Sequence, residues 1–185
     1  MVPELLGEAE SKMTKSVEAL RRELQTLRTG RASPTLVERL SVEYFGTPTP
    51  LQQLATIHAP EPRLLVIQPY DKGSFGAIEK AILKSDLGLN PTNDGKVIRL
   101  NIPQLTEERR REMVKVARKK VEESRIALRN VRRDVHKDMT DFESEKMISK
   151  DELARGEDQL QRLTDRFTLE ADKLGQAKEA EIMEV

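Results

Sequence analysis

Residues 106–139 read TEERRREMVKVARKKVEESRIALRNVRRDVHKDM, a long segment without proline on which the predicted architecture rests. Its apolar residues recur every three or four positions, which is the period of an amphipathic α-helix. Thr106 is a favourable N-cap, and Glu107 and Glu108 place acidic side chains in the first turn, where the helix dipole favours them. We expect one helix of about 35–40 residues, roughly 55–60 Å long. Its buried face is predicted to comprise Met113, Ala117, Val121, Ser124, Leu128, Val131, Val135 and Met139.

Two further segments have the same period. The first is predicted to end at Gly30, with Arg28 in its last turn. The second opens at Ser149 and Glu152, which match the Ser-x-x-Glu capping box. Three long helices with narrow apolar faces predict an antiparallel bundle. The inward residues are predicted to be Leu6, Ala9, Met13, Val17, Leu20, Leu24 and Leu27 in the first helix, and Leu153, Leu160, Leu163, Phe167, Ala171 and Leu174 in the third.

The segment between the first two helices has a different character, because all but one of the nine prolines lie in residues 34–103. Short alternating or apolar runs predict strands at 40–44, 55–58, 64–67 and 97–102, and a helix of about 12 residues around 75–82. The predicted fold class is therefore α+β. A three-helix bundle of residues 1–30 and 105–185 carries an inserted small α/β domain of residues 31–104. Two short crossings join the two parts, and we expect them to act as a hinge.

Composition excludes several classes of protein. The 185 residues include 32 Lys+Arg and 32 Asp+Glu but no cysteine, so we expect no disulfide, thiolate metal site or cysteine nucleophile. No apolar run approaches the roughly 18 residues of a membrane span. The first residues lack the features of a signal or transit peptide, and we expect a cytoplasmic protein.

Enzyme chemistry is not indicated. The two histidines, His58 and His136, fall in different predicted domains, and no nucleophile, base and orienting group stand together. Gly88 to Lys96 resembles a phosphate loop, but the required glycine and hydroxyl positions are Asn90 and Val97. We therefore expect a protein that is not an enzyme and takes no cofactor or metal.

The charges are unevenly distributed, although they cancel overall. Residues 105–137 carry 12 basic and 6 acidic side chains, whereas residues 138–185 carry 7 and 14. The basic side chains form a strip beside the apolar face of the second helix, about 30 Å long. Arginine binds phosphate oxygens in pairs, and the near absence of aromatic residues favours the backbone of folded RNA over single strands. The alternative is that these arginines pair with the acidic third helix. The strip comprises Arg111, Arg118, Arg125 and Arg132, spaced by seven, with Lys115, Arg129, Arg133 and His136 beside them.

Five motifs, in this order along the chain, resemble those of the bacterial ribosome recycling factor family. They are RTGRASP at 28–34, YFGTPTPL at 44–51, SDLGLNP at 85–91, LTEERR at 105–110 and RNVRRD at 129–134. The resemblance covers essentially the whole chain. It implies a bundle and a small domain joined by two hinge segments, in an L shape similar to transfer RNA.

The resemblance also implies a function. Family members act after peptide release, as monomers that bind the large ribosomal subunit and its 23S rRNA. With elongation factor G, which hydrolyses the GTP, they split the ribosome into subunits and free mRNA and tRNA. By matching motif, Arg110, Arg129 and Arg132 are similar to positions that contact rRNA, and Arg28 beside the hinge is a further candidate. The hinge positions implied are Gly30, Arg31, Pro34, Pro103, Gln104 and Leu105.

Two other functions are compatible with the residues alone. A coiled-coil adaptor or holdase would bind protein along the bundle, and it would have no reason to bind rRNA in a salt-sensitive manner. A hydrolase using scattered carboxylates would need an acidic pocket with raised pKa values.

Overall fold

A computed structural model describes residues 1–184, and their contacts divide the chain into two compact units. One unit contains residues 1–29 and the chain from Glu107 onward. The other contains Gly30–Thr106.

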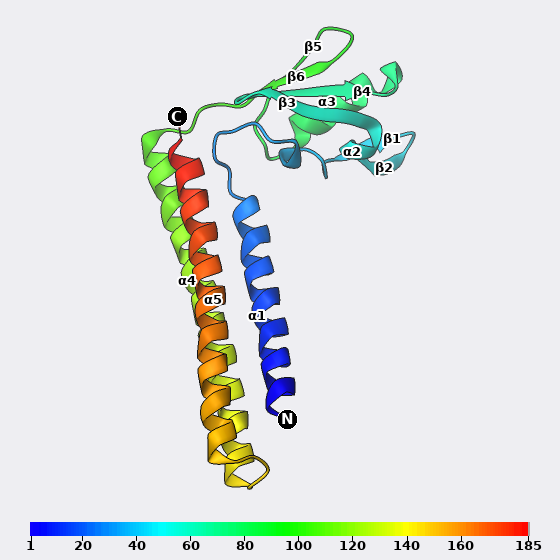
Figure 1. Ribbon diagram of the computed structural model, residues 1–185. Helices are drawn as coiled ribbons and strands as arrows, with labels where there is room; N and C mark the ends of the chain where they lie inside the picture. The colour runs from blue at the N-terminus through cyan, green and yellow to red at the C-terminus, as the bar shows by residue number, and fades with distance from the viewer. Residues whose placement is uncertain (185) are drawn as a thin grey trace. The chain divides into compact units, whose positions relative to one another are not determined.

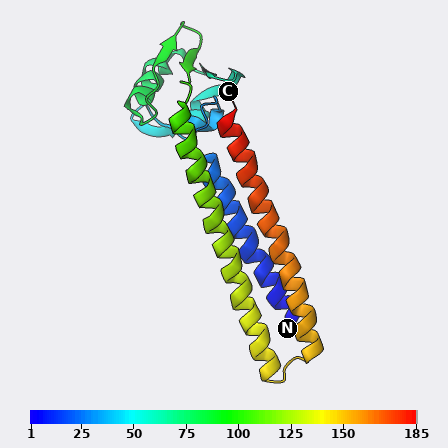
Figure 2. The same cartoon turned by 90° about the vertical axis from the view of Figure 1, so that its left-hand side faces the viewer.

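The first unit is a bundle of three long helices, α1 (Val2–Gln25), α4 (Glu107–Ser144) and α5 (Lys150–Met183). Helix α4 runs antiparallel to both of its neighbours, and the shorter α1 lies beside the other two over part of their length (Figures 1 and 2). Helix α4 has 38 residues and begins directly after Thr106, with Glu107 and Glu108 in its first turn. The predicted bundle and the predicted length of its central helix are confirmed.

The bundle core consists of the residues that the period of the sequence selects. Seven of the eight predicted inward residues of α4 are buried, and Val131 is half-buried. In α5, Leu160, Phe167 and Ala171 are buried, while the other three predicted residues lie half-exposed at the edge of the core. Burial of these side chains holds the three helices together.

Helix α1 ends earlier than predicted. Its last residue is Gln25, and Arg22, not Arg28, is the basic residue of its last turn. The amides of Thr26 and Leu27 bond to the carbonyls three residues earlier, and the Thr26 hydroxyl bonds to Glu23 O at 2.6 Å. These bonds satisfy two of the last carbonyls of the helix, those of Glu23 and Leu24, without a glycine at its end. Gly30, at φ +76°, lies beyond the helix.

The turn between α4 and α5 is built from two local motifs. Lys146 adopts φ +61°, and the Met147 amide bonds to Phe142 O at 2.8 Å, which closes α4 with a Schellman-type cap. The predicted capping box opens α5. Glu152 N donates to Ser149 Oγ at 3.1 Å, and Ser149 N donates to Glu152 Oε2 at 2.7 Å.

The second unit holds a hairpin and a four-stranded sheet. Strands β1 (Ser41–Tyr44) and β2 (Thr47–Pro50) form the hairpin, and all pairs in the sheet are antiparallel, in the order β3-β4-β6-β5. Helix α3 lies beside the sheet (Figure 1), and its buried Ile78 and Ile82 belong to the apolar core of this unit. The other elements are η1 (Pro34–Leu36), α2 (Leu51–Leu54), β3 (Ala55–Glu61), β4 (Leu64–Pro69), η2 (Lys72–Ser74), α3 (Phe75–Lys84), β5 (Pro91–Asn93) and β6 (Ile98–Asn101).

Two strands were not predicted, β2 and β5, and both contain proline. Proline has no amide to donate, so it is tolerated in strands that lie at an edge, as both of these do. Phe45 and Gly46 join β1 to β2 in a two-residue turn in which both have positive φ. The four predicted strands are present as β1, β3, β4 and β6, and α3 has 10 residues where about 12 were expected.

Candidate nucleic-acid interface on helix α4

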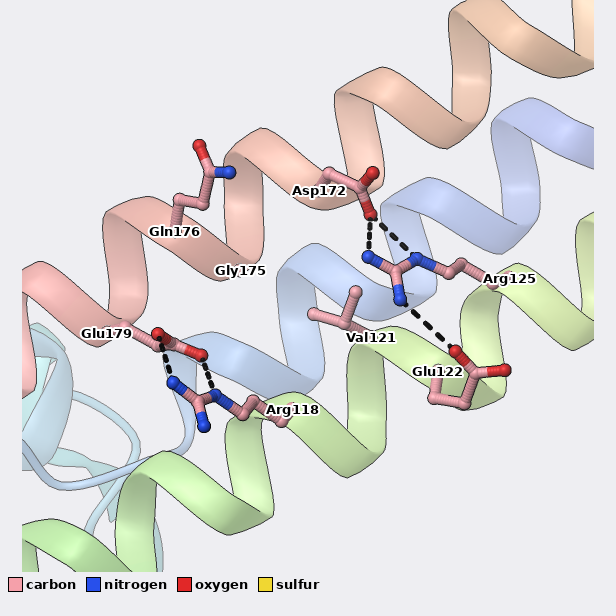
Figure 3. Close-up of a pocket in the computed structure, with 8 residues that line it drawn as sticks. All are labelled: Arg118, Val121, Glu122, Arg125, Asp172, Gly175, Gln176 and Glu179. Atoms are coloured by element: carbon pink, nitrogen blue, oxygen red, sulfur yellow. Dashed lines mark hydrogen bonds and ion pairs between the residues drawn. The ribbon is translucent and has the colours of Figure 1, made fainter.

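Two of the arginines spaced by seven lie along the seam between α4 and α5. Arg118 donates two hydrogen bonds to Glu179, at 2.7 and 3.3 Å. Arg125 Nε donates to Asp172 at 2.7 Å, and its Nη1 donates to Glu122 on its own helix at 3.2 Å (Figure 3). These carboxylates raise the pKa of both guanidinium groups. Arg118 and Arg125 therefore pair with carboxylates of α5, which is the alternative to RNA binding that the sequence left open.

Close packing of the two helices accompanies these ion pairs. Between the two arginines, Val121 points toward Gly175 of α5, where the chain has no side chain to hold the helices apart (Figure 3). The groove above them has a volume of about 490 Å³ and is crossed by both ion pairs. All of the carboxylates that line it are bonded to an arginine. This groove is a structural seam.

Arg132, the next arginine of the row, has a neutral partner. Its Nη1 donates to Gln161 Oε1 at 3.0 Å, and Gln161 Nε2 donates in turn to Asp165 Oδ1 at 2.8 Å. The amide thus stands between the guanidinium and the carboxylate. Among residues 1–184 no carboxylate is hydrogen-bonded to Arg132, so its charge is less completely neutralised than that of Arg118 or Arg125.

Arg129 and Arg133 flank Arg132, and we call these three residues the 129–133 patch. Arg129 bonds to Glu122 at 2.8 Å, but Glu122 is shared with Arg125. The two guanidinium groups together lower the pKa of Glu122. Arg133 is 74% exposed and lies 3.7 Å from Asp134. The patch therefore presents three guanidinium groups within five residues, and one of the two carboxylates beside them, Glu122, is shared with Arg125.

The remaining predicted arginines lie near the start of α4 and beyond the end of α1. Arg111 bonds to Glu107 one turn earlier and is 72% exposed. Arg110 is half-buried, and its Nε is buried without a hydrogen-bond partner among the described residues. Arg110 and Arg132 are 22 residues apart, which is about six turns, so they face the same side of α4 about 33 Å apart. Arg28 lies exposed after α1.

The predicted hinge residues lie close to the two places where the chain passes between the units. Gly30 has φ +76°, and a Cβ atom built on it would lie 3.3 Å from Leu105 Cγ and 3.4 Å from Leu105 N. The two crossings therefore run side by side here. Arg31, Pro103 and Gln104 are exposed, and Pro34 begins η1.

A family model described as ribosome recycling factor matches residues 20–183. The chain belongs to the ribosome recycling factor family. It is 60% identical over 185 residues to the ribosome-recycling factors of Carboxydothermus hydrogenoformans and of Roseiflexus sp., and 58% identical to that of Heliobacterium modesticaldum. All of both chains is covered in each comparison.

Solved structures of recycling factors have the same fold. A solution structure of a ribosome recycling factor is 47% identical and superposes with a TM-score of 0.80, covering 100% of this chain and 98% of that one. A second structure is that of the T. thermophilus recycling factor with E. coli elongation factor G on the E. coli post-termination complex. The recycling factor in that complex is also 47% identical to this chain, with a TM-score of 0.68 and full coverage of both chains.

Sequence reasoning did not identify the α5 partners of the arginine row. Asp172 and Glu179 are spaced by seven, as are Arg118 and Arg125, and this match was visible in the sequence. It becomes informative once α4 and α5 are known to be antiparallel neighbours. No spacing or charge pattern in the sequence marked Gln161 as the partner of Arg132. None of the described helices is long and apolar enough to cross a membrane, and the described residues contain no cluster of three or more potential metal ligands.

Proposed function

We propose that this protein recycles ribosomes after termination. It binds the large subunit through 23S rRNA and, with elongation factor G and the GTP that this factor hydrolyses, separates the subunits and frees mRNA and tRNA. Membership of the recycling factor family supports this role. A related factor, 47% identical, has been placed with elongation factor G on a post-termination complex. We further propose that the protein acts in the cytoplasm as a monomer.

The observation that carries the RNA-binding part of the proposal is the state of the 129–133 patch. Arg118 and Arg125 are engaged with carboxylates of α5, whereas Arg132 is held by the neutral side chain of Gln161. A guanidinium group that is positioned but not neutralised can bind two phosphate oxygens at once. The patch, together with Arg110 on the same side of α4, is the proposed rRNA contact, with Arg111 and Arg28 at its margin.

The bundle is suited to transmit force. Helices α4 and α5 are 38 and 34 residues long, and they are joined by ion pairs as well as by the apolar core. We propose that the α5 carboxylates stiffen the bundle through Arg118 and Arg125 and leave RNA binding to the neighbouring arginines. This division assigns a role to the acidic third helix.

The joint between the units is proposed to lie at Gly30 and Leu105, with Arg31, Pro34, Pro103 and Gln104 around it. Thr29 marks the last residue of the bundle before the crossing, and its hydroxyl bonds to Glu181 of α5 at 3.3 Å. Two crossings that run together allow one unit to turn relative to the other about a single place in the chain. The protein therefore needs rigidity and a joint, and we propose that it has no catalytic step or cofactor of its own.

The test is sedimentation of post-termination ribosomes with this protein, elongation factor G and GTP, each omitted in turn. We expect conversion to subunits when all three are present and intact ribosomes when any one is absent. Ribosomes that stay intact with all three, while the same elongation factor works with another recycling factor, would refute the proposal. Salt-insensitive binding to ribosomes would favour the protein-binding adaptor instead.

A further inference from the structure

We propose that the outer edge of β1, together with the facing side of α3, is a docking site for an extended acidic segment of a protein partner. The segment would add to the β1–β2 hairpin as a third strand. This site lies in the small unit, and it is independent of the RNA contacts proposed for α4.

The pairing of β1 with β2 determines which of its backbone groups remain available. Ser41 pairs with Pro50 and Glu43 pairs with Pro48. Proline has no amide hydrogen, so neither can be a pair that exchanges two hydrogen bonds. Bonded and non-bonded pairs alternate along an antiparallel ladder, so Val42 and Tyr44 make the bonds to β2. The N–H and C=O groups of Ser41 and Glu43 therefore point away from β2.

These outward groups are not used elsewhere in the fold. Within residues 1–184, no backbone or side-chain hydrogen bond involves the amide or carbonyl group of Ser41 or Glu43. Both residues are exposed. A row of unpaired strand groups is a template for pairing with another extended chain.

A groove runs along this edge, with a volume of about 520 Å³. Leu40 and β1 form one wall, and one face of α3 forms the other. That face carries small residues, Gly76, Ala77 and Ala81, and a Cβ atom built on Gly76 would meet no atom within 4 Å. Small residues leave room for a backbone to approach the edge of β1.

The charges of the groove select the partner. Lys80 and Lys84 stand one turn apart on α3 and line the groove, and both are exposed. Side chains of an added strand alternate in direction, so every second residue of the segment would face this wall. Acidic residues at those positions would meet the two lysines. RNA fits less well, because the groove has no aromatic lining on which bases could stack, and Glu43 lies at its rim.

The probe for the test is an acetylated and amidated peptide of alternating Glu and Val, six residues long, titrated into the full-length ¹⁵N-labelled protein. We expect the amide signals of Ser41 and Glu43 to shift and their hydrogen exchange to slow. Replacing Lys80 and Lys84 together by Glu should weaken binding by about tenfold or more. The matched control is Lys96→Glu, an exposed lysine in the same unit, which should leave the affinity unchanged.

Two further arms distinguish strand addition from simple charge attraction. Ser41→Pro removes an outward amide without removing a bond to β2, and should abolish binding while the hairpin signals persist. A peptide that is N-methylated at alternate residues lacks its own donors and tests the same pairing on the unaltered protein. Undiminished binding of the methylated peptide would overturn the proposal. So would peptide shifts confined to α4, no binding at about 1 mM, or lysine-dependent binding of oligouridine in place of the peptide.

Discussion

A Cβ atom built on Gly175 of α5 would lie 2.6 Å from Cγ2 of Val121 on α4. Real side chains do not approach so closely, so the two helices can adopt this separation only because residue 175 is glycine. Arg118 and Arg125, at positions three before and four after Val121 on α4, bond to α5 on either side of this contact. Close approach of the backbones and the two ion pairs thus occur at one place along the seam.

Replacement of Gly175 by Ala should therefore destabilise the bundle. Val121 is buried and β-branched, so it cannot turn aside freely in a helix. Overpacking of this kind lowers the free energy of unfolding by about 1–3 kcal/mol, which outweighs a gain of up to about 1 kcal/mol in helix propensity. Denaturant unfolding followed by circular dichroism measures the difference.

The matched control is Gly7→Ala in α1, where an added Cβ atom would meet nothing within 4 Å. That variant should be more stable than the parent by about 0.5–1 kcal/mol. Adding Val121→Ala to Gly175→Ala should produce a favourable coupling between the two changes. Equal effects of the two Gly→Ala changes would contradict this account of the contact.

Arg132→Ala should weaken binding to ribosomes with little effect on stability. In the free protein the substitution removes one hydrogen bond to the neutral amide of Gln161, which costs little stability. In the complex with the ribosome it would remove a contact to phosphate. The slope of log affinity against log salt should become shallower by about one. Arg162→Ala is the control, because Arg162 is 79% exposed on α5 and pairs with Asp158. If both variants lose the same affinity, the 129–133 patch is not the contact.

Gly30→Ala should slow ribosome splitting more than it weakens ribosome binding. The new side chain would be strained at φ +76° and would also crowd Leu105 at the proposed joint. Gly88→Ala imposes a comparable left-handed conformation, φ +65°, at a position with open space around it. Both variants should lose about 1–2 kcal/mol of stability from the backbone alone. Rates of ribosome splitting, measured with each variant at a saturating concentration, distinguish the two. Equal splitting rates for Gly30→Ala and Gly88→Ala would argue against a joint at Gly30.

Asp94 should make the small unit sensitive to acid. Its Oδ1 accepts hydrogen bonds from the amides of Lys96 and Val97 at 2.9 Å, and its Oδ2 accepts from Arg99. These bonds, the two amides foremost, hold the pKa of Asp94 well below its usual range. A carboxyl group with a lowered folded pKa stabilises the fold above its unfolded pKa and loses that contribution as the pH falls through the folded value.

The comparison that isolates this group is between the parent protein and Asp94→Asn. At neutral pH the variant should be less stable, because it cannot form the ion pair with Arg99. Below about pH 4 the difference should begin to shrink, because the unfolded parent then binds a proton at Asp94 that the folded parent does not, and it should vanish only once the folded carboxyl group is protonated as well. Hydrogen exchange of the β6 amides at a series of pH values measures the gap. A gap that stays constant into acid would show that Asp94 does not carry this dependence.

The long helices and their caps could be predicted because the information is local. Apolar residues at a period of three or four, the acidic first turn of α4 and the Ser149–Glu152 box are each contained within a few turns of chain. The end of α1 was predicted too late in the chain because Gly30 was expected to end the helix. In the structure the Thr26 hydroxyl group bonds to the carbonyl of Glu23 at the helix end. Strands β2 and β5 were missed because their prolines are compatible with a strand only at a sheet edge, and edges are a property of the assembled sheet.

The candidate site also has features that could be predicted from local sequence and others that depend on packing. The three helices, the inserted α/β unit and the concentration of arginine on α4 were predictable, because periodicity and charge can be read along a single segment. Which arginines are neutralised depends on how the helices pack, since Arg118 and Glu179 are 61 residues apart and meet only when α4 and α5 are neighbours. The need for glycine at position 175 and the open outer edge of β1 also arise only in the folded chain. Ion pairing, close packing and strand pairing each depend on distances between segments that are remote in the chain.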